Sequence, residues 1–179
     1  RGPGRFIAEE IVRVLDVPFY LGLPQEEDHR VAEMIEGPNT SDWVAMLQAS
    51  PHPHSSRNPT FTATLPNDRA WRAAEIPGAN GQGDARGLAT IYGSLVAGGS
   101  RLLSADGLAA AIRPRFEGTD ACFGMPTAYA AGYRLKDPSY GAKASVRTFG
   151  HSGWGGTIAF ADPDARIGFA FVTSRMLGF

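Results

Sequence analysis

Hydrophobic positions repeat with the period of an α-helix through much of the first 115 residues. The pattern predicts an amphipathic helix over 5–15, a second helix from Pro24 to Gly37, and a short third helix over 41–47. The second helix would place Val31, Met34 and Ile35 inward. Residues 50–59 contain three prolines and are predicted to form a loop.

Three more helices are predicted before residue 115. Asn67 or Asp68 can begin one that passes through Trp71, and Ser104 can cap another. The strongest pattern begins after Asp84, which is the expected cap, and ends at Gly98-Gly99. Its apolar positions follow the i, i+3, i+4, i+7, i+8 spacing of one helix face: Leu88, Ile91, Tyr92, Leu95 and Val96.

The period changes from helix to strand after residue 115. Short strands are predicted at 123–125 and 129–135, separated by Pro126, and another at 146–151. Two apolar runs, 157–161 and 167–173, are joined by five residues and predict a hairpin. The chain is therefore expected to be α+β, with a helical subdomain over 1–115 and an antiparallel sheet over 116–179.

Composition excludes several classes of partner. The net charge of −1 and pI near 6.5 give no electrostatic reason to bind nucleic acid or an anionic membrane. No apolar run is long enough to span a bilayer. The single Cys122 cannot form an internal disulfide, so we expect a cytoplasmic protein, with a periplasmic or secreted location left open.

The segment 149–157, Phe-Gly-His-Ser-Gly-Trp-Gly-Gly-Thr, carries the candidate chemistry. Glycines leave backbone N–H groups uncovered, as a site that stabilises an oxyanion requires. His151 is either an acid, base or hydrogen-bond donor, or a histidine satisfied within the sheet. Ser152 is a poor nucleophile, because Trp154 replaces the last glycine of G-x-S-x-G and a strand follows. Trp154 either lines a substrate site or belongs to the core.

Two other motifs carry little weight. His52 and His54 have the spacing of metal ligands, but no Cys, Asp or Glu in the same loop completes a site. Gly81-Gln82-Gly83 lacks the third glycine of a dinucleotide fingerprint, because Arg86 stands in its place. We therefore expect neither a metal nor an organic cofactor.

The glycine-rich segment resembles a known family, the serine β-lactamase and penicillin-binding-protein-like hydrolases, and among them the β-lactamase-like carboxylesterases. These proteins carry an H-x-G or W-x-G triplet on the sheet strand that lines the site, and His151-Ser152-Gly153 looks like that triplet. The stretches Ala159–Pro163 and Gly168–Val172 are similar to the same region. Upstream, Leu21–Pro24, Glu75–Gly81 and Ala85–Ala89 also resemble the family.

The resemblance implies a mechanism and residue roles. A serine of S-x-x-K attacks an ester or amide carbonyl, a lysine and a tyrosine relay its proton, and water then hydrolyses the acyl-enzyme. By position, His151 would donate to the tyrosine or the substrate, and the amide of Trp154 would form one arm of the oxyanion hole. The substrate-binding residues would be Ser152, Gly153, Gly155 and Gly156.

This sequence also departs from the family pattern. Its only lysines, Lys136 and Lys143, are each preceded three positions earlier by a tyrosine, so there is no S-x-x-K. The nearest approach to Y-x-N is Tyr92-Gly93-Ser94, where Tyr92 lies on the apolar stripe of a helix. We therefore interpret the chain as an incomplete, C-terminal portion of such a hydrolase, inactive by itself.

Several hypotheses follow from that interpretation. The substrate of the complete enzyme would be a small carboxylic ester, and a second polypeptide would supply the N-terminal half. Two alternatives remain: a non-catalytic binding or scaffold module of the same fold, and a β-lactamase or peptidase. A histidine at position 151 argues mildly against the latter, because those enzymes usually carry a lysine there.

Overall fold

A computed structural model describes residues 1–38, 40, 45, 49, 62–98, 100–121 and 124–177. The chain begins with a continuous helical stretch made of α1 (Pro3–Ile7), a π-helical turn (Ala8–Val12) and α2 (Arg13–Leu15). This confirms the predicted first helix. Asp16 ends it in the left-handed conformation, with φ of 55°.

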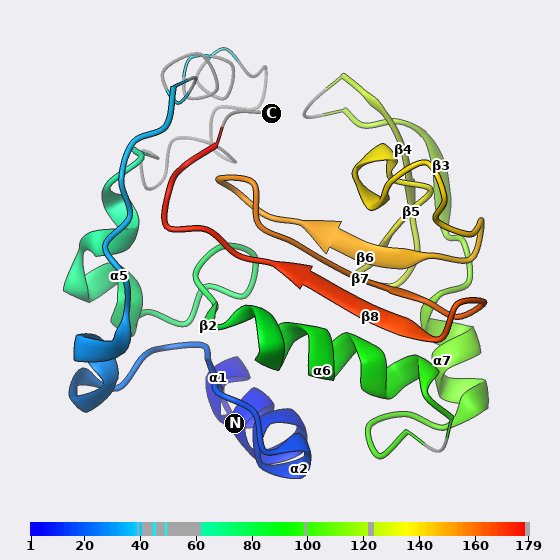
Figure 1. Ribbon diagram of the computed structural model, residues 1–179, viewed down its shortest axis with the longest axis horizontal. Helices are drawn as coiled ribbons and strands as arrows, with labels where there is room; N and C mark the ends of the chain where they lie inside the picture. Colours follow the sequence, from blue (N-terminus) through cyan, green and yellow to red (C-terminus); the bar gives the residue numbers. More distant parts are fainter. Residues whose placement is uncertain are drawn as a thin grey trace.

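Within the described residues, six strands form one antiparallel sheet in the order β3-β4-β5-β6-β7-β8, so each strand pairs with its neighbours in the sequence (Figure 1). The strands are β3 (Phe116–Thr119), β4 (Pro126–Tyr129), β5 (Arg134–Leu135), β6 (Phe149–Ser152), β7 (Ile158–Asp162) and β8 (Ile167–Phe171). The hairpin of β7 and β8 confirms the expected pair of apolar strands. The order leaves β3 and β8 as the two edges of this sheet.

Helix α6 (Ala85–Val96) packs against β7 and β8 and covers one face of the sheet (Figure 1). Asp84 caps it as expected, since its side chain accepts a hydrogen bond from the amide of Gly87. Gly168 of β8 lies against the helix backbone at Gly93 and Ala89, so the absence of a side chain allows the close approach.

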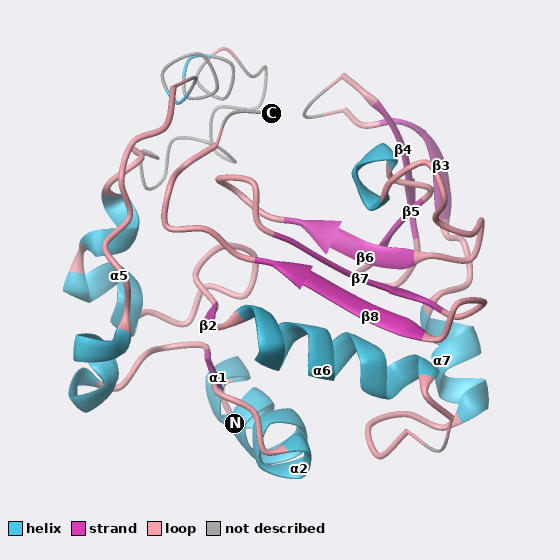
Figure 2. Ribbon diagram, viewed as in Figure 1, coloured by secondary structure: helices cyan, strands magenta, loops and turns pink. Residues whose placement is uncertain are grey.

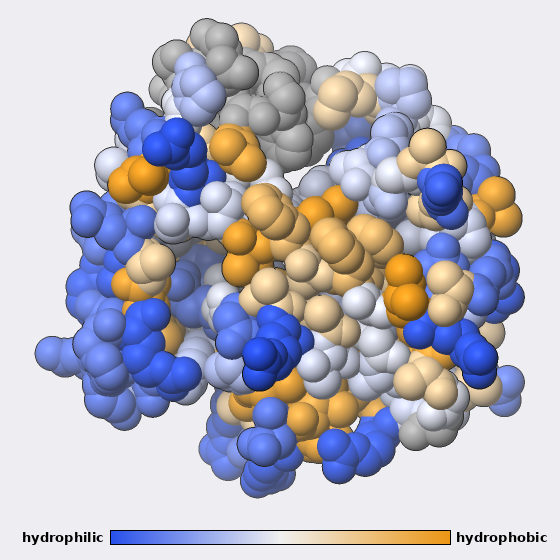
Figure 3. All heavy atoms as spheres, viewed as in Figure 1, coloured by the Kyte–Doolittle hydropathy of each residue, from blue (hydrophilic) through white to orange (hydrophobic). Residues whose placement is uncertain are grey.

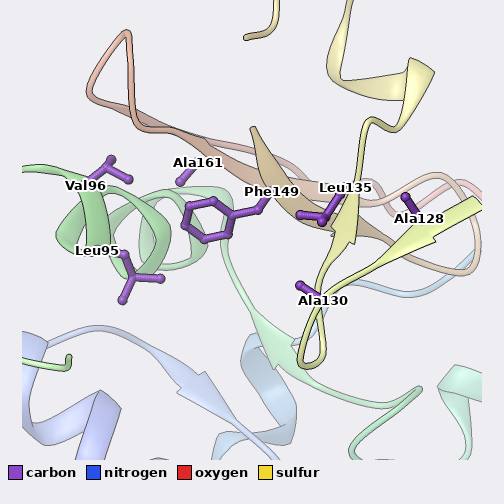
Figure 4. Close-up of a cluster of buried hydrophobic side chains, with 7 residues drawn as sticks. All are labelled: Leu95, Val96, Ala128, Ala130, Leu135, Phe149 and Ala161. Carbon is purple, nitrogen blue, oxygen red and sulfur yellow. The ribbon is translucent and has the colours of Figure 1, made fainter. Parts of the chain in front are cut away.

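The main core lies between α6 and the sheet (Figure 4). The ring of Phe149 is completely buried, and it points from β6 toward Leu95 and Val96. Small side chains surround it on the strands, which keeps the helix close to the sheet. The buried members of this cluster are Leu95, Val96, Ala128, Ala130, Leu135, Phe149 and Ala161.

The remaining α-helices lie below α6, to the left of the sheet and at its lower right in this view (Figure 2). Helix α5 (Arg69–Ala73) begins at Asp68, which caps it, and α7 (Ala105–Ala111) begins at Ser104. Both predicted caps are therefore confirmed. Two short strands, β1 (Phe19–Tyr20) and β2 (Gln82–Gly83), form a separate antiparallel pair. No helix of the described ranges combines the length and apolar composition needed to cross a bilayer.

The predicted second helix is wrong in its extent. A 3₁₀ helix covers only Gln25–Arg30, and Val31 is already extended, with ψ of 124°. Ile35 instead forms a parallel bridge with Arg175, far away in the sequence. Its side chain is 43% exposed, so it does not occupy the inward position of a helix. A distant strand-like segment thus overrides the local helical pattern.

The predicted strands around Pro126 have the wrong bounds, since only Tyr129, Arg134 and Leu135 of the predicted 129–135 strand lie in strands, and Phe123 lies outside the described residues. Pro126 does not separate two strands but is the first residue of β4, where it pairs with Thr119 at the end of the ladder. That position suits proline, which lacks an amide hydrogen. Sequence analysis missed β3 because all four of its residues are exposed and show no hydrophobic alternation. The predicted third helix and the loop at 50–59, with His52 and His54, fall almost wholly outside the described residues.

Candidate active site

The candidate motif lies at the end of β6, where the sheet is open on one side. Strand β5 pairs only with Phe149 and Gly150, whereas β7 pairs with all four residues of β6. Within the described sheet, His151 and Ser152 therefore have a strand partner on one side only. An open strand edge can offer its main-chain groups to a ligand.

His151 is exposed at this edge and is held by two contacts. Its ring stacks with that of Tyr129 on β4, with 6.4 Å between the ring centroids and 22° between the planes. Its Nδ1 lies 2.5 Å from the carbonyl oxygen of Ser152. Because a carbonyl oxygen only accepts, this hydrogen bond places the proton on Nδ1. The neutral imidazole then accepts at Nε2, and His151 can donate there only after taking a second proton.

Ser152 is bound to a residue that sequence analysis did not select. Nη1 of Arg134 on β5 donates to Ser152 Oγ at 3.3 Å, and the same guanidinium pairs with Asp137 at 2.9 Å. Arg134 on β5 lies opposite Gly150 on β6, and Ser152 follows Gly150 two positions later on β6. This contact could not be predicted from sequence alone, because it depends on the register of two strands.

The turn after β6 holds the four remaining candidates. The amide of Gly153 donates to the carbonyl of Thr157 at 2.5 Å, and that of Gly156 donates to the carbonyl of Gly153 at 3.2 Å. Gly155 and Gly156 have φ values of 82° and 90°, in the region that glycine adopts most easily. Here the glycines are needed for the shape of the turn.

Trp154 lies in this turn, beyond the last ladder pair of β6 and β7, which joins Ser152 to Ile158. Its ring meets that of Trp71 edge to face, with centroids 6.4 Å apart and planes at 75°. Trp71 comes from α5 and is only 6% exposed. The indole of Trp154 therefore packs against helix α5, and an edge-to-face aromatic pair of this kind stabilises the contact between the turn and the helix.

Residues 174–177 are hydrogen-bonded both to this turn and to the segment around Ile35. The amide of Leu177 donates to the carbonyl of Gly155 at 3.1 Å. The same segment exchanges hydrogen bonds with Ile35: Ile35 N donates to Ser174 O at 2.8 Å, and Met176 N donates to Ile35 O at 2.9 Å. The extended stretch around Ile35 is thus part of the support of the motif.

Tyr92 does not belong to the exposed part of the site. It lies on α6, and its ring contacts those of Tyr133 and Phe149 in the core. Burial raises the pKa of the Tyr92 hydroxyl well above its ordinary value, with a further contribution from Tyr133. This agrees with the interpretation of Tyr92 as a core residue. Over the described ranges, no group of three or more His, Cys, Asp or Glu side chains is arranged to hold a metal.

Comparison with known proteins identifies the family. The beta-lactamase family model matches residues 1–178, and this chain therefore belongs to that family. The sequence is 35% identical over 126 residues to the esterase/beta-lactamase LipL of Mycobacterium tuberculosis strain ATCC 25618 / H37Rv. That alignment covers 66% of this chain and 28% of LipL.

Solved structures agree with the fold. A family VIII carboxylesterase is 38% identical, with a TM-score of 0.82 over 98% of this chain and 47% of that protein. A penicillin-binding protein homologue from Caulobacter crescentus is 31% identical, with a TM-score of 0.79 over 98% and 47%. EstA from Arthrobacter nitroguajacolicus Rue61a is 28% identical, with a TM-score of 0.83 over 98% and 48%. The chain thus spans about half the length of these structures, and the β-lactamase/transpeptidase-like α+β fold is confirmed.

Proposed function

We propose that this chain is the C-terminal part of a β-lactamase-like serine hydrolase that cleaves small carboxylic esters through an acyl-enzyme. The observation that carries the proposal is the open end of β6, where exposed His151 stands beside a tight glycine turn. Membership in the beta-lactamase family supports the hydrolase class, and the similarity to a family VIII carboxylesterase supports esters as substrates.

Each candidate residue has a role in this proposal. The amide of Trp154 steadies the negative charge on the carbonyl oxygen of the substrate, while Ser152, Gly153, Gly155 and Gly156 line the substrate edge. His151 accepts a proton at Nε2 when neutral and returns it when charged. The attacking serine and its lysine come from outside this chain, because the sequence contains no S-x-x-K.

A probe experiment tests the assignment of the missing nucleophile. The chain is incubated with an activated ester and with a fluorophosphonate that labels reactive serines. We expect neither a burst of product nor a labelled peptide, since without the nucleophile only oxyanion binding remains. A labelled serine together with a burst would show that this chain carries its own nucleophile. An N-terminally extended form that includes an S-x-x-K provides the positive control.

We further propose that an N-terminal half, as a separate polypeptide or as part of a longer chain, covers the outer side of β8. Ile167, Phe169 and Phe171 alternate along this strand and are 49%, 44% and 45% exposed. Hydrophobic residues gather over the middle of the molecule in the space-filling view (Figure 3). β8 is also an edge of the described sheet. Exposed apolar surface at a strand edge favours association.

Light scattering tests this second proposal. We expect the chain alone to form larger species as its concentration rises, and to become monodisperse when the complementary half is added. A stable monomer with a cooperative melting transition would contradict it.

A non-catalytic binding module is the second candidate function, and the missing S-x-x-K favours it. Titration with a β-lactam or a boronate ester separates the candidates. A preorganised oxyanion site binds such compounds weakly, whereas a site that has collapsed does not. The β-lactamase or peptidase alternative draws support from the similarity to a penicillin-binding protein homologue, and turnover of β-lactams by the extended form would favour it.

A further inference from the structure

Arg134 lies at the candidate site, yet the proposed mechanism gives it no role. Its backbone pairs with Tyr129 on one side and with Gly150 on the other, so β5 places it in the middle of the sheet. Its side chain is 20% exposed and reaches along the open side of β6 to Ser152 Oγ, 3.3 Å from Nη1. The guanidinium therefore lies beside the only hydroxyl of the H-x-G triplet.

Neighbouring residues hold both the guanidinium and the backbone carbonyl of Arg134. Asp137, whose side chain is 6% exposed, forms an ion pair with Arg134, with 2.9 Å between its Oδ2 and Nη1 of the guanidinium. Its other oxygen, Oδ1, accepts from the amide and the hydroxyl of Ser139 at 2.9 and 2.7 Å. The hydroxyl of Tyr140 donates to the backbone carbonyl of Arg134 at 3.0 Å. The positive charge is thus already neutralised by a carboxylate that is itself held in place.

We propose that Arg134 is a positioning residue that makes Ser152 a hydrogen-bond donor toward the ligand. A serine hydroxyl has one hydrogen and two lone pairs, whereas a guanidinium only donates. The bond from Arg134 therefore occupies a lone pair of Ser152 Oγ and leaves its hydrogen free to point to the open edge. The inference rests on the proposed function, and it specifies that the ligand presents an acceptor to Ser152, such as the oxygen of an ester or a carboxylate.

The first test needs no ligand. The side-chain rotamer of Ser152 is read from the couplings between its α and β protons by NMR. We expect a single rotamer in the unchanged chain and in the control Lys136→Gln, which removes only an exposed ion pair with Glu117. In Arg134→Met we expect averaged couplings. A single rotamer in Arg134→Met, with the fold intact, would overturn the proposal.

A second variant keeps the test decisive if Arg134→Met does not fold. Ser152→Ala removes the hydroxyl that accepts from Arg134. The NMR signals of the Arg134 guanidinium then show whether this hydrogen bond has been lost. We expect those signals to shift in Ser152→Ala and to return toward their original positions in Ser152→Thr, which restores a hydroxyl. Unchanged guanidinium signals in Ser152→Ala would contradict the contact.

Binding of butyrate, a small carboxylate, tests the effect on a ligand. We expect Arg134→Met and Ser152→Ala each to weaken binding about fivefold, the size typical of one lost hydrogen bond, and the double variant to be no weaker than either single variant. Additive losses would mean that Arg134 binds the carboxylate by itself, and would overturn the positioning role. If butyrate does not bind the unchanged chain, the proposed ligand class fails, while the rotamer test still decides the role of Arg134.

Discussion

Gly155 shows at the scale of one residue why the motif turn needs glycine. Its φ of 82° is unfavourable for residues with a β-carbon, and an added β-carbon would lie 2.5 Å from Sδ of Met176. Met176 is 2% exposed, so its side chain has little room to move away. Sequence analysis expected these glycines to leave amide groups uncovered. In the structure, the absence of a side chain at Gly155 also allows the turn to pack closely against Met176.

We predict that Gly155→Ala destabilises the chain by about 2–4 kcal/mol, because backbone strain and overpacking both contribute. Gly98→Ala is the matched control. It has nearly the same φ, 81°, but nothing lies within 4 Å of its added β-carbon, so only the backbone cost of about 1–2 kcal/mol applies. Urea unfolding of both variants measures the difference. Equal losses would show that Met176 does not restrict the turn.

Sequence analysis selected His151 and Ser152 because their chemistry is visible in the motif itself. It missed Tyr129 and Arg134, whose contacts with these residues depend on strand register. Arg134 lies 18 positions before Ser152, and no local pattern joins residues at that distance. Residues that position a site are predictable from sequence only once the pairing of the strands is known.

At the scale of whole elements, helices with a capping residue and a regular apolar stripe were predicted correctly. Asp68, Asp84 and Ser104 each accept hydrogen bonds from the first turn of their helix. The region after Pro24 has acidic residues that suit a helix start, yet it forms only six residues of 3₁₀ helix. Hydrogen bonds between Ile35 and the chain near Arg175 compete there, and a single-sequence pattern does not contain them.

The contact between α6 and β8 provides a prediction for these two elements. A β-carbon on Gly168 would fall against Gly93 N and Ala89 O, which are backbone atoms of the helix. We expect Gly168→Ala to cost about 3 kcal/mol, because the helix must move off the sheet. Gly93→Ala, on the other side of the same contact, meets its nearest atoms at an ordinary 3.6 and 3.7 Å. It should be neutral or stabilise the chain by up to about 1 kcal/mol through helix propensity. Thermal melting of both variants checks this asymmetry.

Asp162 joins the β7–β8 turn to the loop before β6. Its carboxylate accepts from the amide and hydroxyl of Ser145, from the hydroxyl of Thr148, and from the amides of Asp164 and Ala165. Burial by itself would raise its pKa, but these hydrogen bonds together outweigh burial and hold the pKa well below its ordinary value. The ionised form is therefore the one that stabilises this junction.

This arrangement predicts a loss of stability in acid. The folded-state pKa of Asp162 lies below the unfolded value of about 3.9. The ionised carboxylate therefore stabilises the folded chain above about pH 3.9, and this stabilisation is lost as the pH falls toward the folded-state pKa. We expect Asp162→Asn to cost about 2–4 kcal/mol at neutral pH and to flatten the dependence of unfolding free energy on pH below 4. Asp164→Asn, which removes an exposed ion pair with Arg147, is the control and should change stability little. The same acid slope in Asp162→Asn and the unchanged chain would contradict the assignment.

At the scale of the whole molecule, the two faces of the sheet differ. α6 covers one face and buries Phe149, Ala161 and Leu135. On β8 the remaining positions leave large apolar side chains exposed, while Phe169 stacks on Phe160 with 5.0 Å between their centroids. The two apolar runs predicted the hairpin, but they did not show which face of the sheet a helix covers, because both faces of β8 are apolar.

The exposed face of β8 leads to a prediction about assembly. Replacing Ile167 and Phe171 by threonine removes much of the exposed apolar surface, places a β-branched residue at both positions, and leaves the stack of Phe169 on Phe160 intact. If this face is the surface that associates, the double variant should remain monomeric at concentrations where the unchanged chain forms larger species in light scattering, and it should bind the complementary half more weakly. Phe116→Thr is the control, since Phe116 is 46% exposed on the opposite edge strand β3. A reduction in association by Phe116→Thr but not by the double variant would place the associating surface on β3 instead. The N-terminal half would then have to contact the sheet at the β3 edge.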